Sequence, residues 1–366
     1  MGIFDLMDQR EHEEVVFCHD KTVGLRVIIA IHDTTLGPAL GGCRMWPYGS
    51  EDEALKDVLR LSRGMTYKAA AAGLNLGGGK AVIIGDPKAM KSEAFFRSFG
   101  RFVDGLGGRY ITAEDVGTSV SDMEWVRVET NYVTGIDEVI GGSGDPSPVT
   151  ALGVFYGIKA CAQHRWGSED LQGKTVAIQG VGHVGYYLAK DLHSAGAKLI
   201  VTDIDEKKTT RVEEEFDARV VGTEDIYTVD ANIFAPCALG GVINDQTLEG
   251  FPFAIIAGGA NNQLEHEEKH GELLKNRDIL YAPDYVINAG GLINVANEIE
   301  GYHRERALKQ ARGIYDVLLD VFRIASEQDI PTYEASNRLA EQRIKRIAHL
   351  KDFYTSRAQP AWRLNI

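Results

Sequence analysis

One segment near the middle of this 366-residue chain constrains its fold more than any other. A β-branched run starting at Thr175 leads into Gly180-x-Gly182-x-x-Gly185, then come a helix-like stretch and a second β-branched run ending at Asp203. In this order the glycines allow a tight turn, close approach of the backbone to a pyrophosphate, and close packing of helix on strand. The N–H groups at the start of the helix bind phosphate. The pattern predicts a Rossmann-type parallel sheet that binds a dinucleotide.

The acid at the end of the second run indicates which dinucleotide binds. A carboxylate at the position of Asp203 accepts hydrogen bonds from the ribose diol and repels a 2′-phosphate. Asp205 adds negative charge, and the first arginine after it is Arg211. We therefore predict that the cofactor is NAD rather than NADP.

The alternation of strands and helices predicts an α/β fold with two domains. Strand-like runs separated by helix-like stretches are typical of a doubly wound sheet, and they lie at 174–180, 198–203, 231–237, 253–259 and 279–284. Residues 141–148 are dense in glycine, serine and proline, which favours a linker. The predicted Rossmann domain therefore covers 149–332. We expect the chemistry in a cleft between the domains, near the carboxyl ends of these strands.

The sequence before the linker mixes strands and helices. β-like runs lie at 25–31 and 81–84, and capping-box patterns place helix starts at Ser50 and Ser121. After the Rossmann strands we expect a long helix at about 293–325 and another at 333–350.

Composition excludes several classes of partner. A formal charge of −14 argues against nucleic acid and anionic membranes. No apolar run approaches the length of a membrane span and no signal peptide is recognisable, so we expect a cytoplasmic protein. The four cysteines are scattered among apolar neighbours and are expected to be mostly buried thiols.

Two short patterns of metal-ligating residue types do not predict a metal site. His266 and His270 form an HExxH pattern, but its charged flanks favour a solvated helix turn over a zinc helix. Cys18, His19 and Asp20 are contiguous, so their side chains point in different directions.

Three segments before the linker carry candidate catalytic groups: GMTYK at 64–68, LGGGK at 76–80 and ITAEDVGT at 111–118. Three consecutive glycines lower local stability, so they indicate a backbone that comes close to something. Taken alone, the glycines favour a plain loop and Lys80 a solvated lysine. GxxxxGK[ST] is absent, so the run is not a phosphate-binding P-loop.

Taken together, these segments resemble the Glu/Leu/Phe/Val dehydrogenase superfamily, in particular its leucine and phenylalanine branch. Further matching segments are AIHDTTLGPALGG at 30–42, PVTA at 148–151, ANNQL at 260–264 and YAPDYVINAGG at 281–291. The resemblance covers nearly the whole chain. It implies oxidative deamination, in which an L-amino acid, NAD⁺ and water give a 2-oxo acid, ammonium and NADH. It also implies a homo-oligomer, octamers among the known assemblies, with residues 1–148 and the C-terminal helix at about 333–366 as the substrate-binding and oligomerisation domain.

The resemblance assigns roles to three charged residues. The lysine matching Lys68 holds the substrate carboxylate, the lysine matching Lys80 is the base that activates water, and the acid matching Asp115 handles protons on the substrate nitrogen. A fixed cation suits a carboxylate, and two nearby cations favour an ionised Asp115.

The resemblance also implies which other residues line the two sites. Substrate contacts are expected from Gly41, Gly42, Met65, Leu40, Ala113, Asn262, Leu292 and Val295. Cofactor contacts are expected from Gly180, Gly182, His183, Val184, Gly185, Asp203, Thr150, Cys237, Ala238, Asn261 and Asn288.

The apolar side-chain pocket, formed by Leu40, Ala113, Leu292 and Val295, excludes glutamate because its carboxylate would be buried without a partner. The core motifs favour a branched-chain substrate (leucine, valine or isoleucine). In contrast, Cys43, Leu292 and the tail at 353–362 resemble phenylalanine dehydrogenases, and tryptophan dehydrogenases share some of these features.

Outside this family, a 2-hydroxy-acid dehydrogenase and a non-catalytic NAD-binding protein remain as alternatives. Ammonium dependence of the reverse reaction separates the first from an amino-acid dehydrogenase, and NADH binding without turnover identifies the second.

Overall fold

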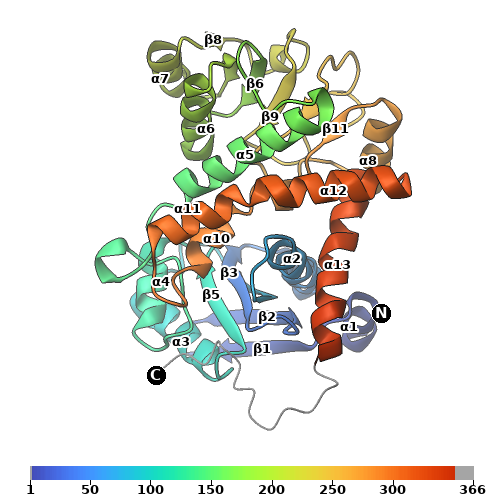
Figure 1. Ribbon diagram of the computed structural model, residues 1–366. Helices are drawn as coiled ribbons and strands as arrows, with labels where there is room; N and C mark the ends of the chain where they lie inside the picture. The colour runs from blue at the N-terminus through green and yellow to red at the C-terminus, as the bar shows by residue number, and fades with distance from the viewer. Residues whose placement is uncertain (1, 351–366) are drawn as a thin grey trace. The chain divides into compact units, whose positions relative to one another are not determined.

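The computed structural model describes residues 2–350, and its contacts divide the chain into two compact units. Within the described residues, the first unit contains residues 2–144, Val295–His303 and residues 340–350. The second contains Asp145–Asn294 and Arg304–Leu339. Figure 1 shows the elements of both units. The tail at 353–362, which resembles phenylalanine dehydrogenases, lies outside the described residues.

The first unit is built on a five-stranded mixed sheet in the order β1-β2-β4-β3-β5. Strands β1 and β2 and strands β2 and β4 pair antiparallel, and β3 pairs parallel with β4 and β5. The strands are β1 (Glu14–Asp20), β2 (Leu25–Asp33), β3 (Ala39–Trp46), β4 (Gly77–Ile84) and β5 (Tyr110–Glu114). Its helices are α1 (Ile3–Arg10), α2 (Glu51–Ala71), α3 (Glu93–Asp104) and α4 (Val120–Arg127), with a short 3-10 turn η1 (Glu138–Ile140).

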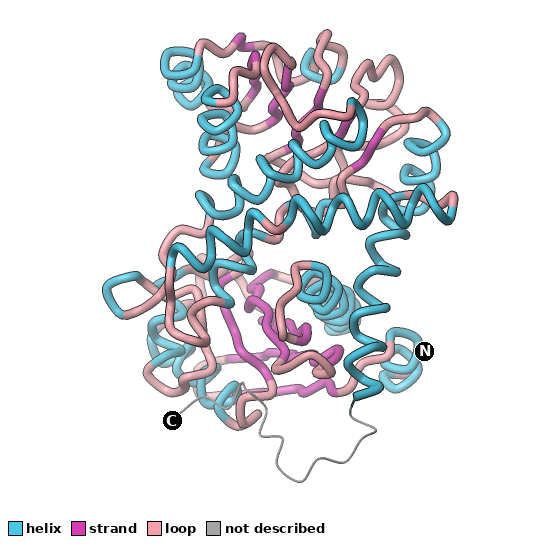
Figure 2. Tube along the Cα trace, in the orientation of Figure 1, coloured by secondary structure: helices cyan, strands magenta, loops and turns pink. Residues whose placement is uncertain are grey.

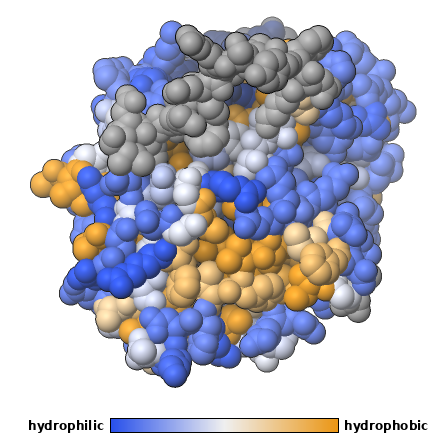
Figure 3. All heavy atoms as spheres, turned by 90° about the horizontal axis from the view of Figure 1, so that it is seen from below, coloured by the Kyte–Doolittle hydropathy of each residue, from blue (hydrophilic) through white to orange (hydrophobic). Residues whose placement is uncertain are grey.

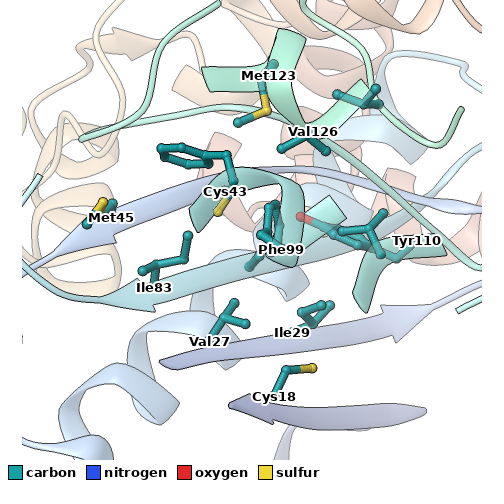
Figure 4. Close-up of a cluster of buried hydrophobic side chains, with 14 of the residues drawn as sticks. Cys18, Val27, Ile29, Cys43, Met45, Ile83, Phe99, Tyr110, Met123 and Val126 are labelled. Carbon is teal, nitrogen blue, oxygen red and sulfur yellow. The ribbon is translucent and has the colours of Figure 1, made fainter. Parts of the chain in front are cut away.

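Helices cover both faces of this sheet. Helix α2 packs through Leu55, Val58 and Leu59 on one face, where it meets Val82 of β4. Helices α3 and α4 cover the other face, where Phe99 and Met123 meet Val27, Cys43 and other residues of the core in Figure 4. Because strand side chains alternate between faces, Gly78 and Lys80 lie on the α2 face with Val82. The glycine run is therefore part of a buried strand, not the plain loop that the run alone favours.

The second unit has a six-stranded parallel sheet in the order β11-β10-β9-β6-β7-β8, which confirms the predicted doubly wound α/β fold. Figure 2 shows its strands between helices. The strands are β6 (Thr175–Gln179), β7 (Lys198–Thr202), β8 (Arg219–Val220), β9 (Ile233–Pro236), β10 (Ile255–Ile256) and β11 (Leu280–Tyr281). The five predicted strands are all present, and β8 was missed because its two residues carry no apolar pattern.

The chain order of these strands creates a switch point between β6 and β9. Strands β7 and β8 extend the sheet on one side of β6, and β9, β10 and β11 extend it on the other. The helices of the second unit are α5 (Ser147–Trp166), α6 (His183–Ser194), α7 (Glu206–Phe216), α8 (Glu267–Asn276), α9 (Asp284–Ile287), α11 (Arg304–Arg312) and α12 (Ile314–Gln328), with a 3-10 turn η2 (Asp225–Tyr227). Helices α10 (Gly290–Ala296) and α13 (Thr332–Leu350) each have residues in both units. In parallel sheets of this kind, ligands bind beyond the carboxyl ends of the strands at the switch point.

Two helix predictions need correction. The long helix expected at 293–325 is three separate helices, α10, α11 and α12, and Gly301 between the first two has φ +82°, which no continuous helix allows. Helix α4 is capped by Ser119, which shares a capping box with Asp122, and not by Ser121. The cap at Ser50 is confirmed by a hydrogen bond from Glu53 N–H to Ser50 Oγ (3.1 Å), and α13 matches the helix expected at 333–350.

All four cysteines are free thiols, and Cys18, Cys43 and Cys161 are buried as expected. Within the described residues no helix is both long and apolar enough to cross a membrane.

Candidate active site and dinucleotide site

An ion pair between Lys80 and Asp115 is the centre of the candidate site in the first unit. Lys80 lies on β4 and Asp115 directly follows β5, and Lys80 Nζ contacts Asp115 Oδ2. The side chain of Lys80 is 8% exposed and that of Asp115 is 18% exposed. A buried ion pair of this kind costs desolvation energy unless its geometry and its further partners compensate. The presence of this ion pair is therefore weak evidence that its role is only to stabilise the fold.

Gly42 makes this ion pair possible. Strand β3 lies between β4 and β5, and Gly42 pairs with Ala113, two residues before Asp115. A Cβ on Gly42 would lie 2.9 Å from Asp115 Cβ and 2.5 Å from Glu114 O. The missing side chain thus leaves room for Lys80 and Asp115 to meet across β3.

Asp115 is held in its charged form by its surroundings. Its Oδ1 accepts a hydrogen bond from Val116 N–H (2.7 Å), and Arg44 Nε lies 3.7 Å from Oδ2. Burial raises the pKa of Asp115, but Lys80 and Arg44 outweigh burial and lower this pKa below its ordinary value.

Helix α2 brings two further predicted residues to the same side of the sheet. A Cβ on Gly78 would lie 2.1 Å from Thr66 N, so α2 lies directly on β4 at this point. Met65 and Lys68 are one helical turn apart on α2, and Met65 Cγ lies 3.3 Å from the position of a Cβ on Gly41. Both side chains are half-buried.

The predicted pocket residues are divided between the two units. Leu40 and Ala113 lie on the α2 face of the first sheet with Gly42, and Leu40 is only 1% exposed. Val295 also belongs to the first unit, whereas Leu292 and Asn262 belong to the second.

The glycine turn of the second unit has the three properties that the motif requires. Gly180 has φ +90°, and a Cβ on it would lie 2.6 Å from Ala238 Cβ. A Cβ on Gly185 would lie 2.0 Å from Gly180 O, so helix α6 lies against the turn. Gly182, the N-cap of α6, has open space where its side chain would be. Open space at an N-cap is what a pyrophosphate requires.

Asp203 supports this turn from the end of β7. Its Oδ2 accepts a hydrogen bond from Val181 N–H (2.9 Å), and its Oδ1 accepts one from Asp205 N–H (3.0 Å). Beside the turn is a pocket of about 340 Å³, lined by Asp145, Val181, Gly182, His183, Tyr186, Tyr187, Lys208 and Arg211. The exposed His183 lies near Asp145, with 3.9 Å between Nδ1 and Oδ2. Val184, the next residue of α6, is half-buried.

The other predicted cofactor residues gather at the switch point. Cys237 and Ala238 follow β9, and Gly259 N–H donates to Cys237 Sγ (3.4 Å). Asn288 Nδ2 donates to Asn261 Oδ1 (2.7 Å) and to Gly259 O (3.2 Å), which fixes the orientation of this amide. Thr150 Oγ1 donates to Pro146 O (2.9 Å) at the start of α5.

The sequence interpretation missed three residues around Asp115. Arg44 lies next to Asp115, and Asp57 and Tyr48 contact Arg44 and each other. The alternation Leu40, Gly42, Arg44 along β3 could have identified Arg44, because strand side chains two apart share a face. Asp57 lies on α2 and has no comparable signal.

The HExxH pattern is not an exposed turn throughout. His266 is the exposed N-cap of α8, but His270 is buried, its Nδ1 accepts His266 N–H (3.0 Å), and α8 continues through Gly271. The interpretation as a solvated turn was therefore wrong for His270. Among the described residues no group of three or more histidine, cysteine or acidic side chains is arranged to hold a metal ion.

Comparison with known proteins assigns both units to known sequence families. Residues 12–132 match the family described as "Glu/Leu/Phe/Val dehydrogenase, dimerisation domain". Residues 141–350 match the family described as "Glutamate/Leucine/Phenylalanine/Valine dehydrogenase". Together the two matches cover most of the chain.

Individual relatives are named as dehydrogenases of different amino acids. A leucine dehydrogenase of Thermoactinomyces intermedius is 60% identical over 345 residues, which is 94% of each chain. A phenylalanine dehydrogenase of Bacillus thermotolerans is 53% identical over 97% of this chain and 94% of its own. The crystal structure of L-tryptophan dehydrogenase from Nostoc punctiforme superposes with a TM-score of 0.86 at 50% identity and covers 94% of this chain and 99% of that chain.

Proposed function

Because the chain belongs to the Glu/Leu/Phe/Val dehydrogenase family, we propose that it oxidatively deaminates branched-chain L-amino acids (leucine, valine and isoleucine). The reaction converts the amino acid, NAD⁺ and water into a 2-oxo acid, ammonium, NADH and a proton, and it is reversible. The observation that carries the proposal is the buried Lys80–Asp115 ion pair on the face of the sheet covered by α2.

The charged residues of the first unit suit the steps of this reaction. Lys68, on α2, supplies a cation for the substrate carboxylate. Lys80 takes a proton from the water that attacks the substrate imine, and Asp115 exchanges protons with the substrate nitrogen. Bound NAD⁺ would accept the hydride from the substrate Cα.

The second unit supports NAD as the cofactor. The turn from Gly180 to Gly185 would receive the pyrophosphate, and the Asp203 carboxylate at the end of β7 would accept hydrogen bonds from the ribose diol. The same carboxylate would repel the 2′-phosphate of NADP.

Two observations support a branched-chain substrate. The side chains of Leu40 and Ala113 are apolar and buried. The side-chain carboxylate of a glutamate substrate packed against them would therefore be buried without a partner. The leucine dehydrogenase of Thermoactinomyces intermedius also matches this chain at 60% identity, against 53% for the phenylalanine dehydrogenase. An aromatic amino-acid substrate is the second candidate, because one methylene group in an apolar pocket is worth only ~1–3 kcal/mol.

The working form is proposed to be a homo-oligomer in which β1 faces a second copy of the chain. The first unit matches a family described by dimerisation, and β1 is an edge strand with Phe17 53% exposed. Figure 3 shows apolar side chains gathered on the face seen from below. The free cysteines suit the reducing cytoplasm, which is the location we propose.

Initial rates of NADH formation at alkaline pH test this function. The substrates are L-leucine, L-valine, L-isoleucine, L-phenylalanine, L-tryptophan and L-glutamate, each with NAD⁺ and with NADP⁺. We expect the highest rates from the three branched-chain substrates with NAD⁺ and none from glutamate. A preference for phenylalanine or tryptophan would favour the second candidate, and no rate with any of the six would contradict the proposed function.

A further inference from the structure

A chain of charged side chains leads from the surface of α2 to Asp115. Asp57 on α2 accepts hydrogen bonds from Tyr48 Oη (2.7 Å), Arg60 NH2 (2.9 Å) and Arg44 NH1 (3.1 Å). Arg44 also faces Asp115, with 3.7 Å between Arg44 Nε and Asp115 Oδ2. One guanidinium therefore bridges two carboxylates from different elements.

The bridging atom of Arg44 is enclosed. Arg44 Nε is buried and makes no hydrogen bond with any described residue, and Asp115 Oδ2 lies 3.7 Å from it. The Arg44 side chain is 23% exposed and that of Asp57 16%, so water screens this bridge only in part.

We propose that Arg44 is a positioning residue that fixes the orientation and the ionised form of Asp115, and that Asp57 holds Arg44 in place for this purpose. The proposal rests on the proposed function, in which Asp115 exchanges protons with the substrate nitrogen. A planar guanidinium suits the role because its N–H groups leave in fixed directions, whereas a lysine ammonium has no such fork.

Two further titratable groups near Asp115 are uncharged, whereas Lys80 and Arg44 are cations that lower its pKa. Cys43 on β3 and Tyr110 on β5 lie near Asp115, and burial raises the pKa of both, so both are neutral at physiological pH. Lys80 contacts the Asp115 oxygen that Arg44 also faces. Removing the charge of Arg44 takes away one of the two cations that lower the pKa of Asp115, so Asp115 would become protonated at a higher pH than in the wild type.

The test compares the pH profiles of three variants, Arg44→Gln, Arg44→Lys and Arg60→Gln. The first removes the charge next to Asp115, and the second keeps a charge without the fork. The third is a matched control, because Arg60 also pairs with Asp57 but is half-exposed and has no contact with Asp115. The measurements are kcat and KM for L-leucine across pH, together with the midpoint of thermal unfolding.

We expect Arg44→Gln to move the acid limb of kcat/KM up by about one pH unit. At pH 7, where Asp115 stays ionised, we expect kcat to fall about tenfold because Asp115 is no longer held in one orientation. Arg44→Lys should restore part of that shift, and Arg60→Gln should keep the wild-type profile. An unmoved acid limb in active Arg44→Gln overturns the proposal. Equal acid limbs for Arg44→Gln and Arg44→Lys also overturn it, since the charge at position 44 would then have no effect. So does a profile of Arg60→Gln that moves as far as that of Arg44→Gln, since the effect would then not be specific to Arg44. A wild-type protein with no activity would contradict the proposed function instead.

Discussion

Gly78 in the first unit is enclosed, whereas Gly182 in the second faces open space. A Cβ on Gly78 would lie 2.1 Å from Thr66 N, and a Cβ on Gly182 would meet no atom within 4 Å. The first glycine lets helix α2 lie on β4, and the second leaves space for a ligand at the N-terminus of α6. The same residue type thus indicates internal packing in one unit and an external ligand in the other.

The charged groups of the two units differ in the same way. Lys80 is buried, Asp115 is partly buried, and the two contact each other, so their chemistry depends on the packing of β3, β4 and β5. Asp203 holds a turn through backbone N–H groups and lies at the end of a strand. We therefore expect substitutions in the first unit to affect turnover or stability, and those in the second to affect cofactor binding.

The largest expected effect is that of Lys80→Ala. Loss of a general base costs about 10²–10⁴-fold in kcat, while the affinity for NADH should remain within about twofold. Steady-state kinetics and a fluorescence titration with NADH check both parts. Lys88→Ala, which alters an exposed lysine after the same strand, is the control. Equal losses of turnover and of NADH affinity would mean that Lys80 acts through structure.

Alanine substitutions of Gly78 and Gly182 should separate an effect on folding stability from an effect on cofactor binding. Gly78→Ala forces a methyl group against the backbone of α2 and should lower the free energy of unfolding by about 3 kcal/mol. Gly182→Ala, at the N-cap of α6, should lower that free energy by only about 1 kcal/mol or less and weaken NADH binding about tenfold. Urea unfolding and NADH titration of both variants provide the comparison, and a Gly182→Ala variant as destabilised as Gly78→Ala would contradict it.

A buried histidine pair should make the first unit sensitive to acid. His12 and His32 lie with 4.8 Å between ring centroids, and their pKa values are lowered to about 4 and about 3, chiefly by burial. In the unfolded chain both pKa values are about 6.5. At a pH between the folded and the unfolded pKa of each histidine, the unfolded state therefore binds more protons than the folded state. Stability is therefore complete above pH 6.5 and falls as the pH drops towards 4, by about 1.4 kcal/mol per pH unit for each histidine.

The variant His32→Asn isolates one of the two contributions. Asparagine can keep a hydrogen bond to Thr66 Oγ1, which lies 2.8 Å from His32 Nδ1, but it does not titrate. Urea unfolding between pH 5 and pH 7 should show a shallower dependence of stability on pH than in the wild type. An unchanged slope would mean that His32 is not responsible.

The smallest expected effect is that of Asp203→Asn. The amide keeps the size of the side chain but loses its charge, so NAD⁺ should bind about tenfold more weakly and the preference over NADP⁺ should narrow. The ratio of kcat/KM for the two cofactors measures this. An unchanged ratio would remove Asp203 from cofactor selection.

The second unit was the more predictable part of the molecule. Its turn, Gly180 to Gly185, and its acid, Asp203, lie in one continuous segment, so local order alone indicates the strands, the helix and the ligand. The helix break at Gly301, a residue of the first unit, was missed because a single glycine inside a helical pattern is usually tolerated.

The site of the first unit depends on contacts between distant segments. Lys80 lies on β4 and Arg44 on β3, and Asp115 follows β5. The sequence alone does not show that Gly42 leaves the space in which Lys80 and Asp115 meet. Lys80 and Asp115 were identified through family resemblance. The alternation along β3 places Arg44 on the same face as Gly42, but its approach to Asp115 depends on the register of β3 against β5.

The most direct test of the proposed chemistry follows the atoms of a single turnover. L-Leucine carrying deuterium at Cα is oxidised with NAD⁺, and the NADH, the ammonium and the 2-oxo acid are quantified. The account predicts equal amounts of all three products, with the deuterium on C4 of the nicotinamide. NADH formed without ammonium, or deuterium lost to water, would contradict oxidative deamination by direct hydride transfer.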